Sequence, residues 1–336
     1  MLLFRAVRPF GSSMVAAAAL LTCLASPAAA QDPADPNSGA ITISGGLDFT
    51  RSYMFRGIRQ ETEGLMIWPY LDLGITLYEG EGSLKSFGVN VGTWNSVHSG
   101  GASGTQPNGP RASNAVNAKA WYESDFYLTF GFGLPNGVSA GLTYTAYTSP
   151  NDAFATVKEL AYKMTWDDSA RHGKFALKPY GIVAAEMDTA TGGPKPIAAG
   201  ATANCVATPD LCYLDTGGQA DGGLFPGVYL EVGIAPSFTA PRFSVAIPVK
   251  LGASLEDYYE DPITREDSNF GFASVAGVIT YPLSVNSSKF GSWNVHGGVE
   301  FMRLGSAAQT MFGELDDDGD LKKHKFLYTV GLGFTY

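Results

Sequence analysis

KFLYTVGLGFTY, residues 325–336, decides the fold class, because it alternates as a β-strand does between two different surroundings. A strand of a soluble sheet would show the same alternation. This strand, however, ends on an aromatic residue, and Tyr328 and Tyr336 lie about one membrane thickness apart, which is typical of the aromatic girdles of outer-membrane barrels. One face of the stretch is continuously apolar and carries Phe326, Tyr328, Val330, Leu332, Phe334 and Tyr336.

Eleven other segments alternate in the same way, which gives the even strand number of bacterial outer-membrane barrels. The first has a break in its apolar face at Arg51, and the tenth changes phase near Ala273, as a β-bulge would make it do. The twelve expected strands are residues 41–56, 65–78, 86–96, 121–132, 138–149, 156–166, 175–187, 227–235, 243–255, 270–283, 293–304 and 325–336.

The connections between these segments alternate in length, as they do in outer-membrane barrels with short periplasmic turns and long outer loops. Only the outer connections 57–64 and 150–155 are also short. A soluble β-sandwich, the alternative, has no reason to sort its connections in this way. The sequence therefore predicts an antiparallel transmembrane β-barrel of twelve strands over residues 41–336. The expected long loops are 97–120, 188–226, 256–269 and 305–324, and the clearest short turns are 134–137, 167–174 and 285–291.

The amino terminus has the features of a cleaved export signal, residues 1–30, followed by a polar linker, residues 31–40. Arg5 and Arg8 precede a small apolar run, 14–25, and three alanines, 28–30, form a small-residue cleavage site. A lipoprotein signal at Cys23 is the alternative, but such signals usually have Gly, Ala or Ser in the place of Thr22. Outside this segment no apolar run approaches the roughly 20 residues of a membrane-spanning helix. Export to the bacterial outer membrane is the expected location.

Removal of residues 1–30 would leave a net charge of −12, which argues against nucleic acid as a partner. Of the three cysteines, Cys205 and Cys212 would remain, both in one loop, and an oxidising compartment favours a disulfide between them over two free thiols. Two cysteines without a nearby histidine predict no metal site.

The segment Tyr53-Met54-Phe55-Arg56-Gly57-Ile58-Arg59-Gln60 resembles the Tyr-x-Phe-Arg-Gly-x-x-Gln motif of the TorF family of proteobacterial porins. A second element, Gly92-x-Trp94-x-Ser96, matches the Gly-x-Trp-x-Ser element that follows in this family. Members more often have Ser-Asp before the tyrosine, where this chain has Arg51-Ser52. The resemblance implies an outer-membrane barrel with a porin role, and it implies no catalytic residues.

Inward-facing charged residues gather toward the outer end of the predicted barrel, and most of them are acidic. Carboxylates in a narrow lumen attract cations and repel anions. We therefore expect a porin-like channel for passive diffusion of small cationic or neutral solutes. A structural ion pair of Arg56 with Glu123 or Asp125 is the alternative, in a non-conducting scaffold that acts through its loops as a receptor or adhesin. The expected pore-lining residues are Arg56, Glu123, Asp125, Glu159, Glu186, Glu231 and Glu300, with Lys163, Lys178 and Lys250 lower in the lumen.

An outer-membrane hydrolase is a further alternative, but His296 and its neighbours Asn294 and Glu300 do not make a triad without a serine, so we expect no enzyme. In the stretch 314–320, Asp316, Asp318 and Asp320 have the spacing of a calcium loop without its closing glutamate, and a solvated acidic loop is the simpler interpretation. We expect no cofactor. The expected partners are small solutes, outer-membrane lipid and lipopolysaccharide, and the barrel-assembly machinery through the C-terminal strand.

Overall fold

The computed structural model describes residues 39–62, 64–99, 120–151, 156–189, 227–259, 261, 266–284 and 287–336. The predicted signal peptide, most of the linker, and Cys205 and Cys212 lie outside these residues. No helix in the described ranges is long and apolar enough to span a bilayer.

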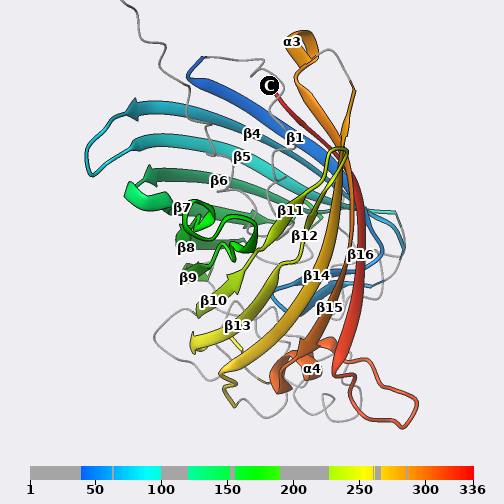
Figure 1. Ribbon diagram of the computed structural model, residues 1–336. Coiled ribbons are helices and arrows are strands. Elements are labelled where there is room, and N and C mark those ends of the chain that lie inside the picture. Colours follow the sequence, from blue (N-terminus) through cyan, green and yellow to red (C-terminus); the bar gives the residue numbers. More distant parts are fainter. Residues whose placement is uncertain are drawn as a thin grey trace, which may run out of the picture.

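One large antiparallel sheet makes up the fold, and twelve of its strands form a closed ring (Figure 1). The C-terminal strand closes it, since it pairs with the first strand on one side and with β15 on the other. The ring strands, in spatial order, are β14 (Phe270–Leu283), β13 (Val249–Glu256), β10 (Val228–Ile234), β9 (Tyr180–Thr189), β8 (Val157–Trp166), β7 (Val138–Thr148), β6 (Trp121–Gly133), β5 (Ser86–His98), β4 (Met66–Glu79), β1 (Ile41–Thr50), β16 (His324–Thr335) and β15 (Ser292–Leu304).

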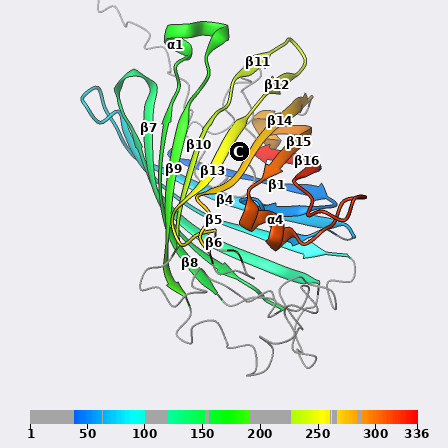
Figure 2. The ribbon, with the colours of Figure 1, turned by 90° about the horizontal axis from the view of Figure 1, so that it is seen from below.

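Short connections lie at one end of this ring. They hold the 3₁₀ turns η1 (Pro135–Gly137) and η2 (Gly173–Phe175), and the short helices α1 (Ser169–His172) and α3 (Ser287–Phe290). The strands β11 (Ser237–Thr239) and β12 (Ser244–Ala246) form a small hairpin that projects beside α1 (Figure 2). The helix α4 (Ser306–Phe312) lies at the opposite end (Figure 1). By the length rule of bacterial barrels, the short connections are periplasmic and α4 is on the outer side.

Large apolar side chains cover the outside of the ring. On β16 the exposed large apolar residues are Phe326, Tyr328 and Val330, and Tyr336 follows directly after the strand, as the alternation predicted. The same outward pattern recurs on the other walls, for example at Leu142 of β7. A closed sheet leaves no unpaired edge, and an apolar outer surface of this extent fits only a lipid environment. The protein is thus a twelve-stranded outer-membrane β-barrel.

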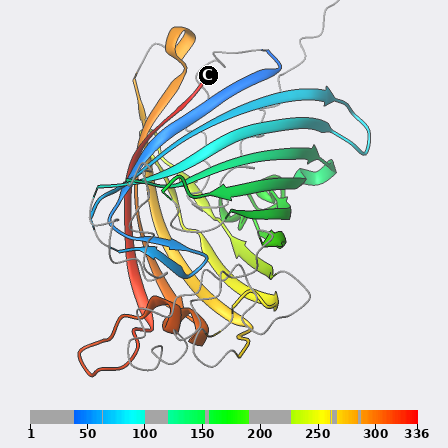
Figure 3. The ribbon, with the colours of Figure 1, turned by 180° about the vertical axis from the view of Figure 1, so that it is seen from behind.

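The first predicted strand was wrong beyond Thr50. The wall strand β1 ends there, and the chain turns inward to form a separate hairpin of β2 (Tyr53–Phe55) and β3 (Ile58–Glu61). The turn begins where the Thr50 hydroxyl bonds the backbone of Ser52, and it follows the break in the apolar face at Arg51. This hairpin, blue in Figure 3, lies inside the ring of strands. The short connection 57–64 is therefore part of an inserted segment and not a simple outer loop.

Two other predicted boundaries were wrong, and both lie at prolines. The strand expected from 175 begins at Tyr180, because residues 176–179 are irregular and Asp168 accepts hydrogen bonds from the backbone N–H groups of Leu177 and Lys178. The strand expected over 243–255 is divided into β12 and β13 at Pro248, which has no N–H to donate to a ladder. The β-bulge expected near Ala273 is confirmed, since the register with β13 shifts at Gly271.

Replacement of Val330 by arginine tests the lipid-facing assignment. Val330 lies mid-strand on β16, and Phe326 lies four residues nearer the outer end on the same face. We expect Val330→Arg to lower the free energy of unfolding by about 2–4 kcal/mol, and Phe326→Arg to lower it by about 1 kcal/mol, because the cost of a charge falls toward the interface. Urea unfolding of both variants in lipid vesicles measures the difference. Equal losses at the two positions would contradict the membrane placement.

Candidate functional site

The tip of the inserted hairpin, residues 53–61, sits on a tight turn with an unusual backbone. Arg56 and Gly57 both have positive φ, at 51° and 82°. Two successive residues of this kind between paired strands make a type I′ turn. Glycine adopts this backbone conformation without strain, whereas arginine is strained in it. A side chain at position 57 would meet the ring of Phe272, so the glycine also permits a close approach to the wall. The strain at Arg56 therefore has to be offset by contacts of its side chain.

The guanidinium of Arg56 is held by a two-point ion pair inside the barrel. Its Nη1 and Nη2 donate to Oε2 and Oε1 of Glu159 on β8, at 2.6 and 2.9 Å. The Nη1 also donates to the hydroxyl of Tyr258 at 3.0 Å, and the guanidinium lies over the ring of Tyr229 at 4.1 Å. Arg56 is 6% exposed and Glu159 is 1% exposed. Since water is excluded, each charge depends on the other for its stabilisation.

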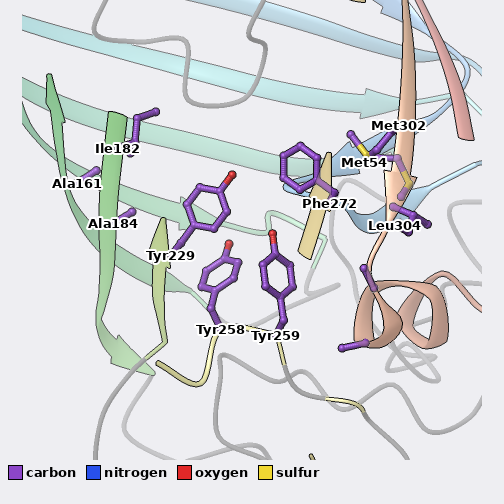
Figure 4. Close-up of a cluster of buried hydrophobic side chains, with 12 residues drawn as sticks. Met54, Ala161, Ile182, Ala184, Tyr229, Tyr258, Tyr259, Phe272, Met302 and Leu304 are labelled. Atoms are coloured by element: carbon purple, nitrogen blue, oxygen red, sulfur yellow. The ribbon is translucent and has the colours of Figure 1, made fainter. Parts of the chain in front are cut away.

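Tyrosines from the barrel wall complete this arrangement. Tyr147 on β7 donates to Oε1 of Glu159 at 3.1 Å, and Tyr259 donates to the backbone carbonyl of Arg56 at 2.7 Å. Figure 4 shows Tyr229, Tyr258 and Tyr259 gathered on one side of the lumen, with their hydroxyl groups pointing the same way. The guanidinium is thus enclosed by groups from three wall strands and from the segment that follows β13.

The base of the hairpin is held by an aromatic cluster on the neighbouring wall. The ring of Tyr53 packs against Trp68 at 5.3 Å and Trp94 at 5.5 Å, and its hydroxyl donates to Glu123 at 2.8 Å. Tyr122 packs against the same ring and donates to the amide oxygen of Gln60 at 2.8 Å. Both ends of the hairpin are therefore fastened by side chains.

The two sequence motifs form one packing unit. The first, with Tyr53, Phe55, Arg56, Gly57 and Gln60, is the hairpin itself, and the second lies on the inner face of β5. Trp94 contacts Tyr53, Gly92 leaves room for the ring of Tyr127, and Ser96 accepts the indole N–H of Trp68 at 3.0 Å. The spacing of Gly-x-Trp-x-Ser places all three positions on the lumen face, since alternate residues of a strand share a face.

Four of the expected pore-lining acids lie together on the lumen wall near the hairpin. Glu123 and Asp125 are two residues apart on β6, and Glu159 lies directly opposite Glu186 of β9. The ion-pair partner of Arg56 is Glu159, and not Glu123 or Asp125 as the alternative had it. Asp125 is 1% exposed, and neither of its oxygens accepts a hydrogen bond from a donor in the described residues. The structure therefore holds more buried carboxylate here than Arg56 neutralises.

The other expected residues make contacts of their own, and Glu231 is linked to the Arg56 site through Tyr229. Glu231 accepts hydrogen bonds from the hydroxyls of Tyr180 and Tyr229, at 2.8 and 2.5 Å. Glu300 lies on β15, across the ring, in an ion pair with Lys250 at 2.9 Å. The Nζ of Lys163 lies 5.3 Å from the ring centre of Tyr180, and Lys178, in the irregular segment before β9, donates to Ser237 of β11.

Two histidine sites lie in the lumen. His296 bonds Asp48 at 2.8 Å and Asn294 at 3.0 Å, and in the described part of the chain no serine hydroxyl is hydrogen-bonded to its ring. His98 bonds Ser96 at 2.8 Å and lies 3.9 Å from Glu61, a combination that sequence reasoning missed. Ser96 is fully buried and already accepts the Trp68 N–H, so it is not placed to attack a solute. Each histidine links its own strand to another one: His296 links β15 to β1, and His98 links β5 to β3.

The acidic outer stretch folds into a tight turn. Asp316 Oδ1 accepts the backbone N–H groups of Asp318 and Asp320, at 3.1 and 3.0 Å. In the ranges that the structure describes, no three His, Cys, Asp or Glu side chains are placed to hold a metal ion. Glu314 instead bonds Lys322 at 2.9 Å and lies 3.9 Å from Arg59 of the hairpin. Together with the contact of α4 with β3, this links the outer segment to the hairpin.

No protein-family model and no curated protein sequence matches this chain. Solved structures of similar form include NanC porin (10% identity, TM-score 0.38, covering 88% of this chain and 99% of that one), outer membrane phospholipase A from Escherichia coli (9%, 0.40, 87% and 92%) and an outer membrane channel from Pseudomonas putida F1 (10%, 0.40, 91% and 99%). At such values these likenesses assign no role to any residue. The resemblance to TorF-family porins stays a prediction.

The dependence of the hairpin on its ion pair is testable with a matched pair of variants. Glu159→Gln leaves the Arg56 guanidinium buried without its counter-charge, and we expect a loss of about 3–5 kcal/mol in unfolding free energy. Glu231→Gln, in the same lumen, keeps an acceptor for its tyrosine hydroxyls and should cost about 1 kcal/mol. Urea unfolding in lipid vesicles measures both. Similar losses would mean that the Arg56 ion pair does not hold the fold together.

Proposed function

We propose that the protein is an outer-membrane channel for small cationic or neutral solutes, and that the hairpin of residues 53–61 closes it in the described state. The proposal rests on a barrel whose lumen wall is rich in carboxylates and which holds an inserted hairpin that is not part of the wall sheet. In this account the hairpin acts as a gate, and the barrel wall forms the conducting path once the gate has moved.

This proposal is supported by the way in which the hairpin is attached to the barrel wall. Among the described strands, β2 and β3 pair only with each other, as a separate two-stranded sheet. Side chains of Arg56, Tyr53 and Gln60 join the hairpin to the wall. The hairpin can therefore leave the lumen without breaking any backbone ladder of the barrel. A strand built into the wall would have no such freedom, since its removal would open the ring.

The charges around the gate support a preference for cations. When the hairpin moves, Arg56 moves with it, and Glu123, Asp125, Glu159 and Glu186 remain on the wall. Carboxylates in a confined low-dielectric passage lower the energy of a cation and raise that of an anion. The closed state is compatible with these acids because Arg56 and the tyrosine hydroxyls stabilise part of their charge.

A non-conducting scaffold is the second candidate, and one observation favours it. The hairpin is fastened at other points besides Arg56: α4, which Thr310 holds to Asp261, contacts β3, and Tyr259 bonds the backbone of the tip. If these contacts never release, the barrel would act through its outer surface as a receptor or adhesin. Conductance distinguishes the two candidates directly.

A disulfide that locks the hairpin tests the gate. A Cβ at position 57 would lie 3.1 Å from the Cβ of Phe272, close to the separation of about 3.5–4.5 Å that a disulfide bridges. We expect Gly57→Cys, Phe272→Cys, in a background with Cys205 and Cys212 replaced by serine, to be silent in planar bilayers when oxidised and to conduct when reduced. The background alone should conduct under both conditions. Equal currents in both redox states would contradict the gate, and silence of the background would favour the scaffold.

Neutralising Asp125 tests the predicted selectivity. Asp125→Asn removes a buried carboxyl group beside Glu123 and keeps the size of the side chain. Asp317→Asn removes the same group from the exposed outer turn and serves as the control. Under a salt gradient we expect the cation-selective reversal potential to move toward zero in Asp125→Asn and to stay unchanged in Asp317→Asn. An unchanged potential in Asp125→Asn, or anion selectivity of the unmodified protein, would overturn the role of the lumen acids.

A further inference from the structure

The ring of Phe55, on the hairpin, lies 4.8 Å from the Arg56 guanidinium, but the other groups that surround it come from the wall and from the segment that follows β13. Glu159 lies on β8, Tyr147 on β7, Tyr229 on β10, and Tyr258 directly after β13. We call these four residues the guanidinium cage. Because each of them is held by the barrel, the cage is expected to keep its form when the hairpin moves.

The cage matches a planar guanidinium in shape and chemistry. Glu159 meets two of its N–H groups side by side, the hydroxyl of Tyr258 accepts a third hydrogen bond, and the ring of Tyr229 covers one face at 4.1 Å. A carboxylate fork and an aromatic face are the two features that distinguish guanidinium recognition from recognition of an ammonium group. An ammonium would meet only one carboxylate oxygen well.

The wall beside the cage offers acceptors that Arg56 does not use. Glu186 lies directly opposite Glu159, and Asp125 lies directly opposite Tyr147. Neither oxygen of Asp125, nor Oε2 of Glu186, accepts a hydrogen bond from any donor in the described ranges. Buried carboxylate oxygens without donors are costly, and their presence points to a ligand with more donors than one arginine side chain supplies.

We propose that the cage is a binding site for a guanidinium-bearing solute, and that Arg56 occupies this site as an internal ligand while the channel is closed. The inference rests on the proposed function in one respect, since a solute reaches the cage only when the hairpin has moved. A second amino or guanidino group on the solute would meet Asp125 and Glu186. The hairpin and the solute would then compete for one carboxylate, which couples solute binding to opening.

Emptying the cage and refilling it with a free ion tests the proposal without any measurement of current. Arg56→Gly removes the side chain and suits the positive φ of that position. We expect its thermal unfolding midpoint, read from heat-modifiable gel migration in detergent, to fall below that of the unmodified protein. Millimolar methylguanidinium should then restore most of the decrease in the unfolding midpoint, and methylammonium at equal ionic strength should not.

Further variants separate cage binding from a general salt effect. With Glu159→Gln added to Arg56→Gly, the recovery by methylguanidinium should vanish, and in the unmodified protein the ion should leave the midpoint unchanged. If Arg56→Gly does not fold alone, its refolding yield with and without methylguanidinium gives the same readout. Equal effects of the two cations, or no effect of either, would overturn the inference. This experiment measures thermal stability and not current. A failure of methylguanidinium to bind is therefore distinguished from a failure of the barrel to conduct.

Discussion

The buried ion pair between Arg56 and Glu159 determines where the inserted hairpin lies and what the lumen contains. A charge moved alone from water into the barrel would cost several kcal/mol, and so would its partner. The two-point geometry, the Tyr147 and Tyr258 hydroxyls and the Tyr229 ring together offset that cost. Without this set of contacts, the positive φ of Arg56 would be strain with nothing to offset it.

The same ion pair links the fold to the proposed function. Barrel strands need one face for lipid and one for the lumen, and a twelve-stranded ring is wide enough to hold more than its own side chains. In this chain a hairpin attached through side chains occupies part of that space. The acids on β6, β8 and β9 then have two possible partners, the arginine of the chain itself or a cation from outside.

The alternation of the sequence predicted most of the barrel, because a strand with lipid on one side alternates between apolar and other residues along its whole length. It did not reveal the hairpin, since Tyr53 and Phe55 continue the period of β1 although they face the lumen and not lipid. The sequence did not predict the guanidinium cage, for a different reason. Arg56 and Tyr258 are 202 residues apart, and no local pattern connects them. The proline at 248, by contrast, was a local signal of the strand break that sequence reasoning did not use.

The motif residues illustrate the same difference between local and distant information. Their spacing placed Gly92, Trp94 and Ser96 on one face of a strand, and it identified the segment 53–60 as distinctive, but it did not say that the two segments touch. Likewise, the strand register brings together the acids on β6, β8 and β9, and their role in lining a pore stays a prediction. Glu300 lies on β15, away from this group, and its ion pair with Lys250 of β13 depends on the register of the strands.

Amide hydrogen exchange of residues 53–61, measured by mass spectrometry on the folded protein in lipid nanodiscs, tests the central claim most directly. A hairpin that pairs with no wall strand and is fastened in the lumen through side chains should exchange more slowly than the exposed turn 81–84 and faster than the wall strands β4 and β5. Exchange as fast as that of the turn would mean that residues 53–61 do not lie fastened in the lumen. It would contradict the closed state described for this barrel.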